Sequence, residues 1–118
     1  MKNYNKISVK EQPRTELHDA LELTGAEISV NALPAGASVP FVHSHKQNEE
    51  IYFILDGKGI AKIDGENVEL NAGDWVRISP TAKRQFFASA DTALKYVCIQ
   101  VKANSLENYT ATDAEIIG

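Results

Sequence analysis

The most informative stretch of the sequence runs Val42-His43-Ser44-His45-Lys46-Gln47-Asn48-Glu49-Glu50-Ile51-Tyr52-Phe53. Because successive side chains of a β-strand point to opposite faces, His43 and His45 are expected on one face, about 7 Å apart along the strand. The polar residues 46–48 predict a short turn that reverses the chain into the next strand. Glu50 would then return a carboxylate beside the two imidazoles.

Two imidazoles and one carboxylate form a ligand set suited to a divalent metal ion such as Zn, Fe, Mn, Ni or Cu. Such a set leaves coordination positions open for a substrate or for water. The alternative is that His43 and His45 are exposed polar residues of a strand with no role as ligands. Glu49, which precedes Glu50, is interpreted as a solvated acid that points outward.

Short segments of β-strand character surround this stretch and are separated by turn residues. They occupy residues 26–33, 39–45, 50–55, 59–64, 67–70, 74–79, 85–89 and 93–101. Eight closely spaced segments with little helical pattern predict an all-β sandwich or barrel. Asp64-Gly65 predicts a two-residue hairpin turn, because both residues tolerate a positive φ.

The segments near the two ends have weaker patterns. Residues 13–23 form the candidate helix of the sequence, and residues 108–118 are expected to be a packed arm or a loose tail. In residues 6–10, Ile7 and Val9 alternate with polar side chains, a pattern suited to pairing with the sheet edge of a neighbouring molecule. We therefore predict a homodimer.

The composition limits the class of protein. With 118 residues the chain has the length of one domain, and 43% apolar and 24% charged residues are typical of a globular fold. A net charge of −4 argues against nucleic acid as a partner, and no apolar stretch is long enough to span a membrane. Cys98 is the single cysteine, which fits a reducing cytoplasm, and is interpreted as a small buried residue of a strand.

Two groups of residues resemble the motifs of the cupin superfamily. Gly36, His43, His45, Glu50 and Gly57 resemble the first motif, G-x5-H-x-H-x(3,4)-E-x6-G, with one extra residue after Gly36. A second group, residues 73–88, resembles the second motif, G-x(5–7)-P-x-G-x-x-H-x3-N. The resemblance implies that residues 1–118 form a single-domain cupin-type jelly-roll β-barrel with a short N-terminal arm. It also implies that His43, His45 and Glu50 bind a divalent metal ion inside that barrel.

The second motif departs from the family pattern, because no histidine follows Gly73. Counting from Pro80 places Gln85 at the position of the missing ligand, whereas counting from Gly73 with the shortest spacing places Arg84 there. Gln85 could offer an amide oxygen to a cation, but Arg84 can only donate hydrogen bonds and would repel one. Gln85 is preferred as the fourth metal ligand, because it keeps the spacing from the proline.

Three further residues are candidates for binding a substrate: Arg84, Tyr52 and Arg77. Tyr52 shares a strand face with Glu50, although a role in the core is an equal alternative. Arg77 shares a face with Trp75, and stacking on that ring at the barrel surface is favoured over anion binding. Trp75 and Phe53 are expected in the core, and His18 is expected at the surface.

The fold implied by the resemblance leaves the reaction open, because such barrels serve many functions. The first hypothesis is a metal-dependent enzyme that acts on a small oxygenated organic molecule, as a dioxygenase or as an isomerase or epimerase. The second is a non-catalytic protein that binds a small molecule, with or without metal, and the missing third histidine favours this alternative.

Overall fold

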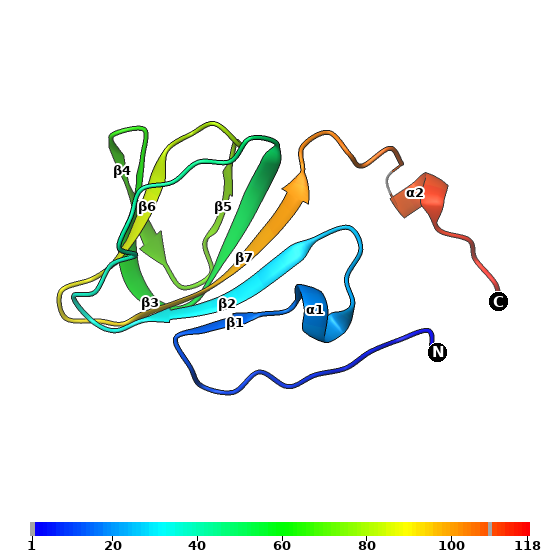
Figure 1. The fold of residues 1–118 in the computed structure, drawn as a ribbon, viewed down its shortest axis with the longest axis horizontal. Helices are drawn as coiled ribbons and strands as arrows, with labels where there is room; N and C mark the ends of the chain where they lie inside the picture. Colours follow the sequence, from blue (N-terminus) through cyan, green and yellow to red (C-terminus); the bar gives the residue numbers. More distant parts are fainter. Residues whose placement is uncertain (1, 109) are drawn as a thin grey trace.

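The computed structural model of the protein describes residues 2–108 and 110–118, and these residues form a β-barrel with extended segments at both ends (Figure 1). The strands are β1 (Arg14–Glu16), β2 (Glu27–Leu33), β3 (Asn48–Ile63), β4 (Glu66–Asn71), β5 (Trp75–Ile78), β6 (Arg84–Ala88) and β7 (Leu94–Lys102). Two short helices, α1 (His18–Leu21) and α2 (Thr110–Asp113), lie outside the barrel. The predicted all-β jelly-roll fold is confirmed.

The long strand β3 joins the two sheets of the barrel. It pairs with β5 and β7 in one sheet, which continues through β2 to β1, and with β4 and β6 in the other. A register shift between Ile54 and Asp56 marks the point where β3 bends from one sheet to the other. The sequence predicted two separate strands here, at residues 50–55 and 59–64, but the chain continues as one strand.

Gly57 explains how β3 turns this corner without ending. Its φ of 87° lies in the left-handed region, and a Cβ atom at this position would overlap the carbonyl oxygen of Ala93. Only glycine allows this approach of β3 to the start of β7. The glycine that resembles the end of the first motif is therefore required by the backbone.

The core of the barrel is formed by inward side chains of both sheets. Tyr52 and Ile54 of β3 contribute to it, and Tyr52 stacks on Phe86 of β6 with ring centroids 4.2 Å apart. The core residues are Tyr52, Ile54, Ala61, Leu70, Ile78, Phe86, Leu94, Tyr96 and Cys98. Aromatic rings thus fill the barrel directly below Glu50, the residue that precedes Tyr52 on the same strand face.

Three predictions about local structure are wrong. Residues 39–45 form no strand. The loop at residues 38–45 meets β6 through isolated bridges, Ser38 with Phe87 and His43 with Arg84, and through hydrogen bonds of Val39. The candidate helix at residues 13–23 is instead strand β1 followed by the single turn α1, because Arg14–Glu16 pairs with β2. Tertiary pairing overrides the weak helical propensity of this segment. Trp75 is 64% exposed and stacks on Phe53 outside the core.

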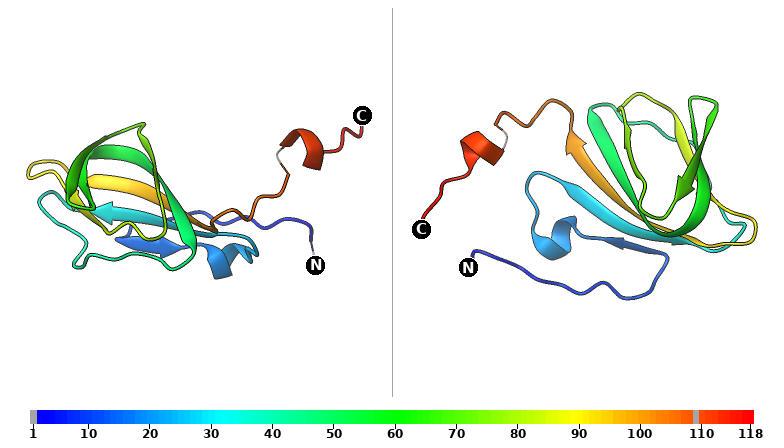
Figure 2. Two further views of the ribbon diagram at one scale, coloured as in Figure 1. Left: turned by 90° about the horizontal axis from the view of Figure 1, so that it is seen from above. Right: turned by 180° about the vertical axis from the view of Figure 1, so that it is seen from behind.

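The predicted hairpin turn is confirmed. Asp64 and Gly65 both have positive φ values, 48° and 86°, and they connect β3 to β4 where Ile63 faces Glu66. The C-terminal segment extends away from the barrel beyond β7, while the N-terminal segment runs beside β1 and α1 (Figure 2). Within residues 2–108 and 110–118, no helix has the length and apolar character that crossing a bilayer requires.

The outer face of the larger sheet carries an apolar row that the monomer leaves partly exposed. Ile28, Ile99 and Ile51 lie in register across β2, β7 and β3 and point away from the core. Ile7 and Val9 in the N-terminal segment are also exposed. Apolar side chains on an outer sheet face and on an extended arm are typical of surfaces that a second copy covers.

We predict that light scattering at micromolar concentration gives twice the 12.9 kDa mass of one chain. The double variant Ile7→Asp, Val9→Asp should shift the protein toward the monomer, because it places charge at the expected contact. The variant Lys6→Gln, Lys10→Gln alters the same segment without touching its apolar positions and should stay dimeric. A wild-type mass near 12.9 kDa would contradict the prediction.

Candidate metal and ligand site

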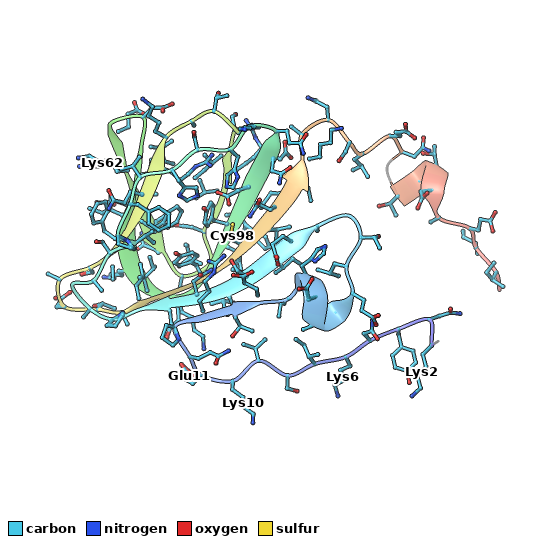
Figure 3. The ribbon with its side chains drawn as sticks, in the orientation of Figure 1. Lys2, Lys6, Lys10, Glu11, Lys62 and Cys98 are labelled. Atoms are coloured by element: carbon cyan, nitrogen blue, oxygen red, sulfur yellow. The ribbon has the colours of Figure 1, made fainter. Side chains whose placement is uncertain are left out.

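One cavity of about 460 Å³ opens into the barrel and is lined by the three candidate metal ligands of the first motif. Its walls come from β1, β2, β3, β6, β7 and the loop at residues 38–45. His43, His45 and Glu50 line it together with aromatic side chains that include Tyr52 and Phe86. Figure 3 shows side chains gathered in this interior, where Cys98 of β7 is labelled.

Glu50 lies at the centre of this site and is only 3% exposed. The Tyr52 hydroxyl donates a hydrogen bond of 2.6 Å to its Oε1 atom. On the other oxygen, His45 Nε2 lies 3.1 Å from Oε2 and the Cys98 thiol donates to Oε2 at 3.3 Å. Both carboxylate oxygens therefore have partners, as a buried charge requires.

The two histidines reach Glu50 from the loop rather than from a strand. Backbone hydrogen bonds hold the loop, because His43 and Arg84 exchange N–H···O bonds of 3.1 and 3.0 Å and His45 N donates to Pro80 O at 2.7 Å. The imidazole rings lie edge to face with centroids 5.2 Å apart, and His43 Nε2 is 3.8 Å from Glu50 Oε1. One ligand atom from each of the three residues lies within 4.8 Å of the others.

Arg84, and not Gln85, is the side chain of β6 that approaches Glu50. Arg84 is fully buried, with Nη1 3.4 Å from Glu50 Oε1 and Nη2 donating to Ser79 O at 2.6 Å. Gln85 also borders the cavity, but its amide donates to Val39 O at 2.7 Å. The preference for Gln85 as the side chain beside the histidines is therefore corrected.

The register of β6 gives the reason for this correction. Arg84 pairs with Ile63 and Phe86 pairs with Ala61, and Phe86 and Ala61 are both buried in the core. Adjacent strand residues face opposite sides, so Gln85 does not share the inward face of Arg84 and Phe86 and borders the cavity where its amide bonds to Val39. Counting from Pro80 assumed the spacing of the family, but the turn before β6 places the inward position one residue earlier.

The surroundings of Glu50 determine its protonation. Burial alone would raise the pKa of Glu50, but the hydrogen bonds from Tyr52 and Cys98, with His45 and Arg84 nearby, lower that pKa below its ordinary value of 4.5. Burial also raises the pKa of Tyr52 and the pKa of Cys98, and the charge of Glu50 adds to both shifts. Tyr52 and Cys98 thus stay protonated donors to an ionised carboxylate.

His43 is kept in its neutral form. Burial is the main reason that its pKa is lowered from the ordinary value of 6.5, and the charge of Glu50 opposes that shift only in part. The positive charge of Arg84 lowers the pKa of His43 further. A neutral imidazole is the form that binds metal ions.

The donor set therefore fits a divalent metal ion with three protein ligands. Two imidazoles and an ionised carboxylate converge on one point. The hydrogen bond from Tyr52 orients that carboxylate. Arg84 opposes this fit, because its positive charge lies beside the carboxylate that would bind the ion. We expect a weaker site than one with a third histidine at this position.

The remaining candidates separate into cavity and surface residues. Tyr52 lines the cavity and also belongs to the core. Arg77 is exposed on the outer face of β5, where its Nη1 donates to Ser79 Oγ at 3.1 Å, so it lies away from the cavity. The stacking partner of Trp75 is Phe53 and not Arg77, with centroids 4.3 Å apart.

Five polar residues of the cavity were not predicted from the sequence: Arg14, Ser29, Asn31, Ser38 and Gln100. Ser29 and Asn31 are buried at alternate positions of β2, where an apolar core would place apolar side chains. This polar alternation within residues 26–33 was the available signal. Arg14 carried no such signal, because its position depends on the pairing of β1 with β2.

Comparison with known proteins identifies the family to which these features correspond. The family model described as "Cupin domain" matches residues 30–100, which is more than half of the chain. Among curated proteins, an uncharacterized protein from Methanocaldococcus jannaschii is 32% identical over 85 residues. The match covers 72% of this chain and 63% of that relative, so it spans less than two thirds of the relative's length.

Two solved structures extend this comparison. A cupin protein from Bacteroides fragilis is 64% identical, with a TM-score of 0.96 over 99% of each chain. A protein from Thermotoga maritima, described as a predicted oxalate decarboxylase, is 28% identical, with a TM-score of 0.60 over 64% of each chain.

The hydrogen bond from Tyr52 to Glu50 predicts a measurable contribution to stability. Tyr52→Phe should lower the free energy of unfolding by about 1.5–3 kcal/mol, because it removes a buried donor to a charged acceptor. Tyr96→Phe is the matched control, since no hydrogen bond of the Tyr96 hydroxyl to another described residue is found. Urea denaturation measures both; equal losses for the two variants would show that this bond does not stabilise the fold.

Proposed function

The chain belongs to the cupin family, and on that basis we propose that it binds a divalent metal ion through His43, His45 and Glu50. We propose further that the metal serves to bind and transform a small oxygenated organic molecule inside the barrel. The observation that carries this proposal is the convergence of three donor atoms within 4.8 Å at the wall of a 460 Å³ cavity. Cavities of this size bury most of the surface of a small ligand.

Each residue of the site has a defined part in this function. His43 offers a neutral imidazole, since its pKa is lowered, and His45 lies beside the carboxylate at 3.1 Å. Tyr52 and Cys98 hold the carboxylate of Glu50 in one orientation. A bound divalent ion would act as a Lewis acid that polarises a carbonyl or enolate oxygen of the ligand. The same set of protein ligands would suit either a dioxygenase or an isomerase.

The apolar walls of the cavity favour chemistry away from bulk water. Phe86 and Tyr96 stack beside Tyr52, so the floor of the cavity is aromatic. Burial raises the pKa of Tyr96 to about 12, which keeps its hydroxyl neutral. A neutral floor beneath a polar group of donors holds the ligand in one orientation and excludes water.

A second function is favoured by one observation, the guanidinium of Arg84 at 3.4 Å from Glu50. Glu50 and Arg84 together carry no net charge, so a divalent ion beside them leaves a local charge of +2. With a neutral histidine in place of Arg84 that charge would be +1. A weaker metal site agrees with a non-catalytic protein that binds a small molecule, and turnover of a bound ligand distinguishes the two functions. In either case the buried single thiol of Cys98 suits a reducing cytoplasm.

Metal binding should depend on the three donors together. His43→Ala, His45→Ala or Glu50→Gln should each lower the affinity for Zn²⁺ or Mn²⁺ by about tenfold or more, because each removes one of three donor groups. His18→Ala is the control, since His18 lies on α1 outside the cavity. Elemental analysis and metal titration of untagged protein measure the effect. Equal metal in wild type and His45→Ala would contradict the proposal.

The placement of Arg84 predicts a gain of function. Arg84→His should tighten metal binding by about tenfold or more, because it replaces a repelling charge with a fourth donor. Gln85→His adds the same side chain one position along, on the other face of β6, and should leave the affinity unchanged. Melting temperatures show whether each variant folds. Arg84→Gln removes the positive charge without adding an imidazole, so it measures the effect of that charge on metal affinity. Tighter binding in Gln85→His than in Arg84→His would refute this assignment.

A further inference from the structure

A row of polar side chains crosses the cavity wall on β1 and β2. Arg14 Nη1 donates to Asn31 Oδ1 at 2.8 Å, and Asn31 Nδ2 donates to Ser29 Oγ at 3.0 Å. Arg14 and Asn31 are partners in the register of β1 and β2, so they share the face that points into the cavity. All three residues line the cavity.

This row is unlike the rest of the interior. Asn31 and Ser29 are buried at positions where β6 and β7 place Phe86, Tyr96 and Cys98. Burying polar groups in a core costs free energy unless they are hydrogen-bonded, and an apolar pair would fill the same space without that cost. The two hydrogen bonds form a chain from Arg14 through Asn31 to Ser29, so their structural result is to hold one guanidinium at the cavity.

The charge of Arg14 remains available to a ligand. Its side chain is 54% exposed, and its Nε atom lies 3.3 Å from Glu16 Oε1, which is also exposed. An ion pair between exposed groups is weak, so Glu16 does not cancel the guanidinium. Its hydrogen bond to the buried Asn31 places the guanidinium at the cavity wall.

We infer that Arg14, positioned by Asn31, is the anion-binding residue of the cavity and that the ligand is a small organic carboxylate. The inference deepens the proposed function, since it takes the same cavity as the ligand site and adds a second point of recognition. Glu50, His43 and His45 would contact the oxygenated end of the ligand, and the fork of Arg14 would bind its carboxylate. Aromatic and aliphatic side chains such as Phe41 and Leu33 line the cavity and would contact the body of the ligand.

The chemistry of the row favours a carboxylate over a phosphate. A guanidinium binds a carboxylate with two parallel hydrogen bonds, and one such group matches a single negative charge. A phosphate group carries about two charges and more acceptor oxygens than one guanidinium satisfies. Arg14 is the one arginine or lysine among the residues that line this cavity.

The test uses four carboxylates with their amides as probes: benzoate, phenylacetate, 2-oxobutyrate and succinate, with phenyl phosphate as a further probe. Calorimetric titrations are made on metal-free and on zinc-loaded protein. We expect at least one carboxylate to bind wild type about tenfold more tightly than its amide. Arg14→Met should abolish that preference in metal-free protein, where no metal ion can bind the carboxylate.

Two variants serve as controls. Arg77→Met removes an arginine from the outer face of β5 and should keep the preference for the carboxylate. Asn31→Asp has nearly the same shape but gives Arg14 an internal negative partner, so it should lose the preference while the melting temperature is preserved. If Arg14 only stabilised the fold, Arg14→Met would weaken the binding of the amides and of the carboxylates equally.

The outcomes separate this inference from the proposed function. Loss of the carboxylate preference in Arg14→Met supports the inference even where metal titrations show no binding. It is overturned if wild type prefers no carboxylate to its amide, if Arg14→Met keeps the preference, or if phenyl phosphate binds more tightly than every carboxylate. If the protein binds metal but shows no carboxylate preference that depends on Arg14, the proposed function is retained and this inference is overturned.

Discussion

The buried carboxylate of Glu50 is the constraint on which the site and much of the barrel depend. A charge in an apolar interior is tolerated only when hydrogen bonds and opposite charges surround it. Its partners come from separate parts of the chain: Tyr52 from β3, Cys98 from β7, Arg84 from β6 and His45 from the loop. Both sheets must therefore close around β3 before the carboxylate is satisfied, and the same closure brings the histidines to it. The contacts that close the barrel are therefore also the contacts that form the site.

Features that depend on residues close together in the sequence were predicted correctly, whereas features that depend on the pairing of distant strands were not. His43, His45 and Glu50 lie within eight consecutive residues, so their spacing along the chain was enough to predict that they converge. The hairpin at Asp64-Gly65 is equally local. Arg84 was misjudged because its orientation is fixed by pairing with Ile63 of β3, which no count of residues from Pro80 contains. Arg14 could not be found, because its place in the cavity depends on β1 adding to the edge of β2.

The cavity that results combines two groups of polar side chains with apolar walls. The first group, His43, His45 and Glu50, offers donors to a metal ion, although Arg84 would make it a weaker metal site than a third histidine. The second group offers the guanidinium of Arg14, which is bonded to Asn31 and through it to Ser29. Stacked aromatic rings form a floor that gives a ligand contact area. Under the proposed function, a ligand is recognised by both polar groups together.

The claim that Glu50 organises a metal centre is tested most directly by locating the ion. Crystals grown with Co²⁺ and measured at its absorption edge would give the position of the metal in an anomalous difference map. The account predicts one strong peak in contact with His43, His45 and the carboxylate of Glu50, with Tyr52 still bonded to that carboxylate. No peak at this position under saturating Co²⁺, with Arg84 still paired to Glu50, would contradict it and leave a barrel that binds its ligand without metal.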